Sequence, residues 1–79
     1  MSKYQINDIV RFTAPDGSVK EGYIWRIDVY PLAICYDIFI RDKNVIYKHL
    51  AEKWVQEKTG VNTEEDFIHL PTLIDDYRE

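Results

Sequence analysis

The sequence predicts one small, mainly β domain, and three observations support that prediction. The chain has 79 residues, enough for a single hydrophobic core. Between residues 8 and 48, runs of β-branched and aromatic residues alternate with turn signals at the close spacing of a small antiparallel barrel. Apolar residues in this stretch do not recur at the spacing of an amphipathic helix. We therefore expect an antiparallel β-barrel of about five strands.

The first expected strand covers residues 8–14. Val10 and Phe12 share one of its faces, because side chains alternate along a strand. Pro15 presets the backbone angle at the start of a turn, and Gly17 tolerates the left-handed conformation that a tight turn requires. Residues 15–18 are therefore predicted to form a hairpin turn.

The second expected strand covers residues 19–30 and is long for a single strand. Gly22 indicates a bulge or bend near its start. Ile24 and Ile27 both resemble core residues, yet a spacing of three puts them on opposite faces of a regular strand. A bulge or strong coil between them would place both inside. Pro31 then interrupts strand pairing, because proline lacks the backbone donor.

Two further strands follow before a fifth. Residues 33–41 have the clearest two-residue period of the chain, with Tyr36 and Ile38 on the predicted core face. Residues 42–44 form the next turn, and residues 45–48 the fourth strand. We expect residues 50–57 to make one helical turn and then a short strand at 54–56.

The C-terminal part of the chain differs from the rest in charge. Residues 1–60 have a net charge of +1, whereas residues 61–79 have a net charge of −5. Asn62 or Thr63, followed by acidic residues, is typical of a helix start. Pro71 would end that helix and begin a second one over 72–78. The predicted organisation is thus a barrel over 1–60 and an acidic helical segment over 61–79.

The predicted order of elements resembles that of the SH3-like small barrels, particularly the KOW and Tudor-like groups. The resemblance covers about residues 8–56 and rests on Asp8-Ile9-Val10, Gly17, residues 22–27, residues 36–38 and residues 52–55. A KOW-like relationship implies RNA or ribosome binding. A Tudor-like relationship implies an aromatic cage for methylated side chains, for which the candidates are Tyr23, Trp25, Tyr30, Phe39 and Tyr47.

The sequence shows no constellation that would support catalysis, a metal or a cofactor. Cys35 has neither histidine near it in sequence, and His49 and His69 lack metal-ligand spacing. We therefore expect no enzyme activity. There is no apolar stretch long enough to span a membrane and no signal peptide, and a single cysteine is typical of a reducing compartment. A cytoplasmic protein without a membrane partner is predicted.

The charge pattern favours a protein that binds another macromolecule. The leading hypothesis is a small acidic protein-binding module or inhibitor whose partner is a protein, such as a basic nucleic-acid-binding protein. In size and charge the chain resembles phage-encoded inhibitors of host defence nucleases, such as anti-CRISPR proteins. The expected partner-binding residues are Glu64, Glu65, Asp66, Asp75, Asp76, Leu73 and Tyr77.

The alternative hypothesis is a nucleic-acid-binding barrel. Exposed aromatic side chains can stack on bases, and basic side chains beside them can contact phosphates. The expected residues of this face are Tyr23, Trp25, Arg26, Tyr47 and Lys48. The identity of the partner, the oligomeric state and the choice between the two surfaces stay open at this point.

Overall fold

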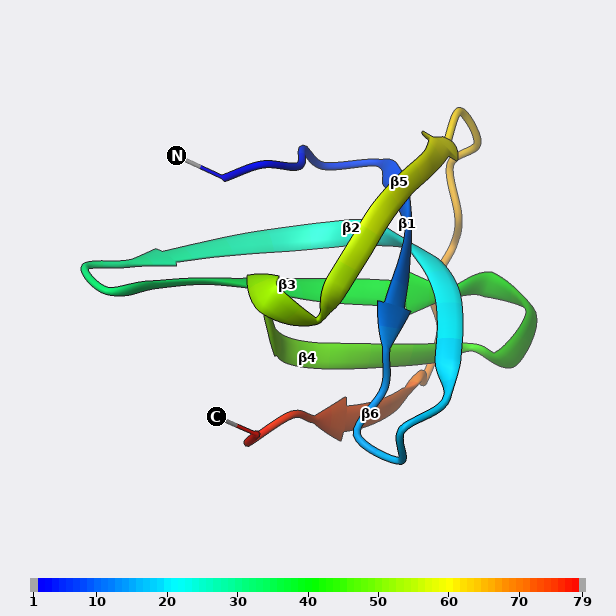
Figure 1. The fold of residues 1–79 in the computed structure, drawn as a ribbon. Helices are drawn as coiled ribbons and strands as arrows, with labels where there is room; N and C mark the ends of the chain where they lie inside the picture. The colour runs from blue at the N-terminus through cyan, green and yellow to red at the C-terminus, as the bar shows by residue number, and fades with distance from the viewer. Residues whose placement is uncertain (1, 79) are drawn as a thin grey trace.

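The computed structural model describes residues 2–78, which form one strongly bent sheet of six strands (Figure 1). The strand order is β5-β1-β2-β3-β4-β6, and every neighbouring pair is antiparallel except β4 and β6, which are parallel. The prediction of a mainly β fold is confirmed. The strands are β1 (Asp8–Thr13), β2 (Val19–Tyr30), β3 (Ala33–Ile40), β4 (Val45–Ala51), β5 (Val55–Val61) and β6 (Thr72–Asp75).

The sheet does not close into the predicted barrel. Figure 1 shows β1 and β5 crossing β2, β3 and β4 at a steep angle, but β5 and β6 remain the two edges of the sheet. The contact between β1 and the C-terminal segment is made by a side chain instead of a strand ladder. Arg78 donates hydrogen bonds to the backbone carbonyls of Thr13 and Ala14, at 2.7 and 2.8 Å.

The first hairpin forms where the sequence predicts it. Gly17 has a φ of 86°, in the left-handed region that glycine accepts without strain. The Asp16 carboxylate accepts hydrogen bonds from both the backbone amide and the hydroxyl of Ser18, at 2.9 and 2.6 Å. These contacts fix the turn locally, which is why the short sequence motif suffices to predict it.

Strand β2 changes direction sharply, as Figure 1 shows. The predicted bulge is confirmed: the pairing of β2 with β3 shifts register between Ile24 and Arg26, so Trp25 is the extra residue. As a result Ile24 is fully buried, and Ile27 packs against the same core from a half-buried position. Trp25 is left partly exposed.

The connections between β3 and β5 also match the predicted ones. A 3-10 turn, η1 (Arg41–Lys43), ends at Asn44, whose φ is 53°. A second 3-10 turn, η2 (Glu52–Trp54), leads directly into β5. The predicted helical turn before a fifth strand is thereby confirmed.

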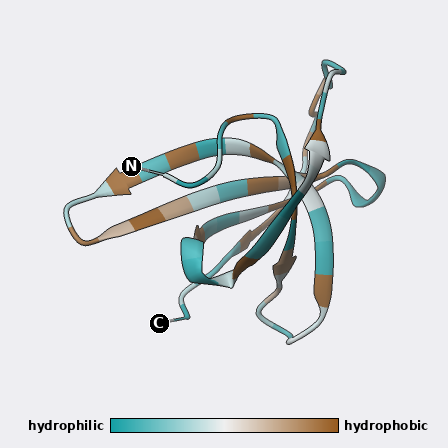
Figure 2. Cartoon of the chain, turned by 45° about the horizontal axis from the view of Figure 1, so that its top comes forward, coloured by the Kyte–Doolittle hydropathy of each residue, from teal (hydrophilic) through white to brown (hydrophobic). Residues whose placement is uncertain are grey.

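Side chains are buried on both faces of the sheet. The main core contains the residues predicted to lie inside, with Val10, Tyr36 and Ile38 fully buried. Figure 2 shows hydrophobic residues interspersed with hydrophilic ones along the sheet. A second, smaller cluster consists of Tyr23, Phe39 and Ile46, with Ile9 and Ile68 packed against it. Ile68 belongs to the C-terminal segment, so that segment covers part of the second face.

The prediction of two C-terminal helices is wrong. Residues 62–71 follow an irregular path, and Thr72–Asp75 form β6. The free edge of β4 offers backbone partners that an isolated short helix lacks: Thr72 donates to the carbonyl of Asn44, and Asp76 to that of Lys48. Tertiary pairing therefore overrides the local capping signals. Residues 2–78 include no helix with the length and apolar character that a membrane crossing needs.

Candidate functional site

The acidic residue Asp66 is fixed to the sheet by two side chains. The guanidinium of Arg41 donates two hydrogen bonds to its carboxylate, both at 2.8 Å, and the hydroxyl of Tyr23 donates a third at 2.8 Å. A planar guanidinium matches the two oxygens of a carboxylate, so this contact also fixes orientation. Asp66 is therefore a structural anchor with three donors.

A buried asparagine continues the same network. The side-chain oxygen of Asn62 accepts a hydrogen bond from Arg41 at 2.6 Å, while its amide donates to the backbone carbonyl of Glu64 at 2.8 Å. The backbone amide of Asn62 donates to the carbonyl of Asn7 at 2.7 Å. These bonds hold residues 62–66 against β2 and the start of β1. The carboxylate of Glu64 then lies 3.7 Å from the Arg41 guanidinium and is largely exposed.

The protonation states follow from these contacts. Hydrogen bonds from Arg41 and then from Tyr23 hold the pKa of the Asp66 carboxyl below its usual value. The hydrogen bonds to Asp66 in turn raise the pKa of the Arg41 guanidinium. Burial, followed by the bond to Asp66, raises the pKa of the Tyr23 phenol to about 12. At neutral pH the network thus contains a carboxylate, a guanidinium and a neutral phenol.

The two sets of candidate residues meet at one surface hollow of about 370 Å³. Trp25 and Tyr23, from the proposed barrel face, line it together with acidic residues of the C-terminal segment. Trp25 is 42% exposed, whereas Tyr23 is buried and presents its hydroxyl to Asp66. The full lining is Ile6, Asn7, Tyr23, Trp25, Asn62, Glu64, Glu65 and Asp66. Hereafter we call this the acidic hollow.

A row of exposed apolar side chains follows the acidic hollow along the chain. Phe67 and Leu70 are 90% and 82% exposed, and Leu73 and Tyr77 are also largely exposed. In β6 the side chain of Ile74 points to the main core, so Leu73, on the opposite face, points away from it. We call these four residues the apolar row. Exposed large apolar side chains next to unpaired charges are typical of binding surfaces.

The two remaining acidic candidates have different environments. Asp76 was expected to be an exposed binding residue, but it is buried: Arg78 bonds both of its carboxylate oxygens. Its position on the inner face of the C-terminal segment explains this, because it alternates with Leu73 and Asp75 along an extended backbone. Asp75 is exposed and lies 3.3 Å from the Nδ1 atom of His49.

The residues of the expected nucleic-acid-binding face are dispersed. Tyr47 belongs to the main core, where its ring packs edge-on against Phe12 with centroids 5.4 Å apart. Lys48 lies 4.0 Å from the buried carboxylate of Asp37. Arg26 is exposed and lies 3.7 Å from Asp28. The described residues do not form a continuous aromatic and basic surface here.

Sequence reasoning missed the basic residues that organise the C-terminal segment. Arg41 joins Asn62 to Asp66, and Arg78 joins Asp76 to the end of β1. The guanidinium of Arg78 also lies over the ring of Trp54, 4.3 Å from its centroid. One signal was available: Arg78 is the single cation among the six acidic residues of the segment 61–79.

No protein-family model, curated protein or solved structure matches the chain. Among residues 2–78, no group of three or more His, Cys, Asp or Glu side chains is arranged to hold a metal ion. The acidic hollow and the apolar row are therefore interpreted from their own chemistry.

Replacing Tyr23 by Phe tests the network around Asp66. The change removes the hydroxyl that donates to the Asp66 carboxylate and leaves the ring contact with Phe39. We expect a loss of about 1 to 2 kcal/mol in unfolding free energy, measured by urea denaturation. In the parent protein, spectrophotometric titration should show one tyrosine ionising near 12, absent from the variant. Because folding raises this pKa, its contribution to stability is present below pH 10 and is lost as the pH rises through the folded value. A variant with unchanged stability and titration would contradict this assignment.

Proposed function

We propose that this chain is a non-enzymatic protein-binding module that recognises a basic, partly apolar segment of another protein. The observation that supports the proposal most is that the acidic hollow is followed directly along the chain by the apolar row. Acidic groups of residues 64–66 and the exposed ring of Trp25 line one hollow, and Phe67 begins the apolar row next to it in the chain. Charged groups can guide a basic partner, and large apolar side chains can hold it.

The acidic residues of the hollow have different roles, because Asp66 is bonded within the chain whereas Glu64 and Glu65 are exposed. Arg41 and Tyr23 already bind the Asp66 carboxylate, so it has little capacity left for a partner. The Glu64 carboxylate lies 3.7 Å from the Arg41 guanidinium and its side chain is 75% exposed, and Glu65 makes no ion pair within residues 2–78. We therefore assign partner recognition to Glu64 and Glu65 and positioning to Asp66.

The preferred partner class is a protein with a basic surface, as found in proteins that bind nucleic acid. An inhibitor of such a protein is the most specific form of the proposal. The order of β1 to β5 and the 3-10 turn before β5 support a distant relationship with SH3-like domains, whose members bind diverse partners on a shared scaffold. Direct nucleic-acid binding has less support, because Tyr23 and Tyr47 are buried and Trp25 borders carboxylates that repel phosphates.

Charge reversal at Glu64 and Glu65 tests the proposal. Partners are first captured from a lysate of the source cells with the parent protein and identified by mass spectrometry. For a captured basic protein, the double variant Glu64→Lys/Glu65→Lys should lower the association rate by about tenfold at low salt, because electrostatic steering is lost. The difference should shrink at high salt, where charges are screened. Surface plasmon resonance measures both rates.

The matched control is Glu21→Lys/Glu57→Lys, which changes net charge equally on β2 and β5, outside the acidic hollow. Its association rate should fall less than about threefold, because it affects binding only through the general field of the protein. The control also removes the exposed Arg11–Glu57 ion pair and the Thr59–Glu21 hydrogen bond, so circular dichroism must first show an unchanged fold. Equal effects of the two double variants would contradict a local acidic site. Binding of duplex or single-stranded nucleic acid by the parent protein, weakened steeply by salt, would support the nucleic-acid alternative instead.

A further inference from the structure

The hairpin formed by β2 and β3 projects beyond the rest of the sheet and is capped by apolar residues. Figure 1 shows its tip extending from the body of the molecule. Leu32 at the tip is 99% exposed, and Val29 and Tyr30 beside it are 68% and 49% exposed. The eight residues 29–36 contain no Asp, Glu, Lys or Arg. We call the exposed side chains of Val29, Tyr30 and Leu32 the apolar knob.

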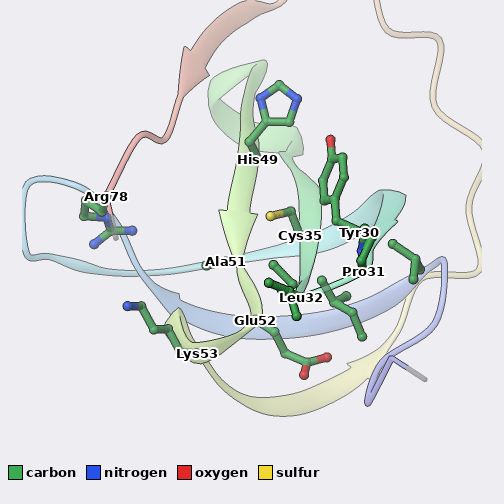
Figure 3. A pocket seen from close by; sticks show the side chains of 12 residues that line it. Tyr30, Pro31, Leu32, Cys35, His49, Ala51, Glu52, Lys53 and Arg78 are labelled. Atoms are coloured by element: carbon green, nitrogen blue, oxygen red, sulfur yellow. The ribbon is translucent and has the colours of Figure 1, made fainter.

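An open groove of about 1090 Å³ lies beside this hairpin (Figure 3). The tip residues 29–33 themselves contribute to its lining, and Ile34 and Cys35 of β3 and Ala51 of β4 continue its apolar part. The groove continues toward η2 and Arg78, so it joins the hairpin to the body of the domain. Leu32 is one of the residues that line it. The knob and the groove therefore lie on the same side of one molecule.

Most of the charged groups around the groove already have charged or hydrogen-bonding partners within the chain. The Glu52 carboxylate accepts hydrogen bonds from the Tyr36 hydroxyl and from the backbone amide of Lys3. His49 lies 3.3 Å from Asp75, and Lys53 lies over the ring of Trp54. Arg78 is bound by Asp76. Lys53 is exposed and makes no ion pair within residues 2–78, so the uncharged part of the groove is the one formed by Ile34, Cys35 and Ala51, and that part favours an apolar segment.

We propose that the groove binds the hairpin tip of a second copy of this chain. The tip, residues 29–33, supplies the uncharged apolar segment that the groove favours. Because knob and groove are adjacent, a twofold axis between two copies seats each Leu32 in the groove of the other at the same time. A contact in which the same patch serves both partners is the usual geometry of a homodimer.

The size of the surface predicts a weak dimer. A standard interface buries about 800 Å² on each partner, roughly a seventh of the 5333 Å² surface of this chain. The hairpin tip and groove involve about a dozen residues, fewer than the 20 to 30 per side of a standard interface. We therefore expect a weak dimer, with dissociation at micromolar or higher concentrations. The acidic hollow lies outside this surface, so the dimer does not depend on the proposed function.

Sedimentation velocity at concentrations from about 1 µM to 1 mM tests the dimer. The parent protein should shift from monomer to dimer within this range. Leu32→Glu should raise the dissociation constant at least tenfold, because burying a carboxylate in the apolar part of the groove costs more than burying a leucine. Circular dichroism should show an unchanged fold, since Leu32 makes almost no contact within its own chain. A second variant, Val29→Glu, should act in the same direction.

Phe67→Glu is the control, because it also replaces a nearly fully exposed apolar side chain by a carboxylate, but in the apolar row. Its dimerisation should equal that of the parent protein. A parent protein that stays monomeric up to 1 mM would overturn the proposal. So would a dimer that survives both Leu32→Glu and Val29→Glu, or one that Phe67→Glu abolishes while Leu32→Glu preserves it.

Discussion

Replacing Asp76 by Ala should lower the free energy of unfolding by about 3 kcal/mol, a large part of the stability of a domain of this size. The Asp76 side chain is 1% exposed, and it receives bonds from both the side chain and the backbone amide of Arg78. Its removal frees a partly buried guanidinium that now links β1, Trp54 and the C-terminal segment. Thermal and urea denaturation measure the loss, which should lower the melting temperature by about 10 °C or more.

Asp75 provides the matched control, because it is the neighbouring residue and also a carboxylate. It is exposed and faces His49 at the surface, so Asp75→Ala should cost less than about 1 kcal/mol. Arg78→Lys should not preserve the stability of the parent protein, since an ammonium cannot bond two carbonyls and a carboxylate in the same planar geometry. Equal stability of the Asp75 and Asp76 variants would refute the structural role of Asp76.

The effect of Asp76 should depend on pH. Burial acts to raise the pKa of this carboxyl, but the hydrogen bonds and charge of Arg78 outweigh it, and the net pKa lies below the ordinary value of 3.8. A carboxyl with a lowered folded pKa stabilises the fold above its unfolded pKa, and the contribution is lost as the pH falls through the folded value. The stability difference between parent and Asp76→Ala should therefore be constant near neutral pH and shrink below about pH 4.

The parts of the fold that could be predicted are those fixed by local sequence. Pro15 and Gly17 fix the first turn, and the three-residue spacing of Ile24 and Ile27 requires the bulge at Trp25. Strand β3 was recognisable from its two-residue period. In each case the residues that determine the structure lie within a few positions of it, so no knowledge of distant contacts is needed.

The C-terminal segment was mispredicted because distant partners determine its path. Its acidic start favours a helix locally, yet the free edge of β4 and the guanidiniums of Arg41 and Arg78 bind it in an extended form. The same contacts explain why Asp66 and Asp76, which sequence alone placed at a binding surface, are anchors. Of the acidic candidates on this surface, Glu64, Glu65 and Asp75 keep exposed carboxylates.

The candidate surface depends on the sheet because its residues come from several different strands. Tyr23 and Trp25 come from β2, Arg41 follows β3, and Leu73 lies in β6. Asp76 and Arg78 fasten the end of β6, which keeps Leu73 directed outward. A change that shifts β2 relative to β3 should therefore disturb the acidic hollow as well as the core.

Gly22→Ala is expected to produce such a change, with a loss of about 3 kcal/mol in unfolding free energy. A Cβ atom at Gly22 would lie 2.5 Å from the backbone carbonyl oxygen of Phe39 and 2.9 Å from the Cγ2 atom of Ile38. The first contact is with backbone in the neighbouring strand, so a side-chain rotation cannot relieve it, and β2 must move away from β3 next to the Tyr23–Phe39 pair.

Gly60→Ala makes the same chemical change in an edge strand and serves as its control. Its added methyl group would have as its nearest neighbour the Cδ1 atom of Ile9 at 3.7 Å, an ordinary van der Waals distance. We expect its stability to stay within about 0.5 kcal/mol of the parent, because the lower entropy of the unfolded chain offsets any small cost. Urea denaturation compares the two variants directly. The Gly22 variant should also lose the tyrosine that ionises near 12, since displacement of β2 separates Tyr23 from Asp66. If both variants are equally stable and both retain that titration, β2 and β3 do not approach each other as closely at Gly22 as the structure shows.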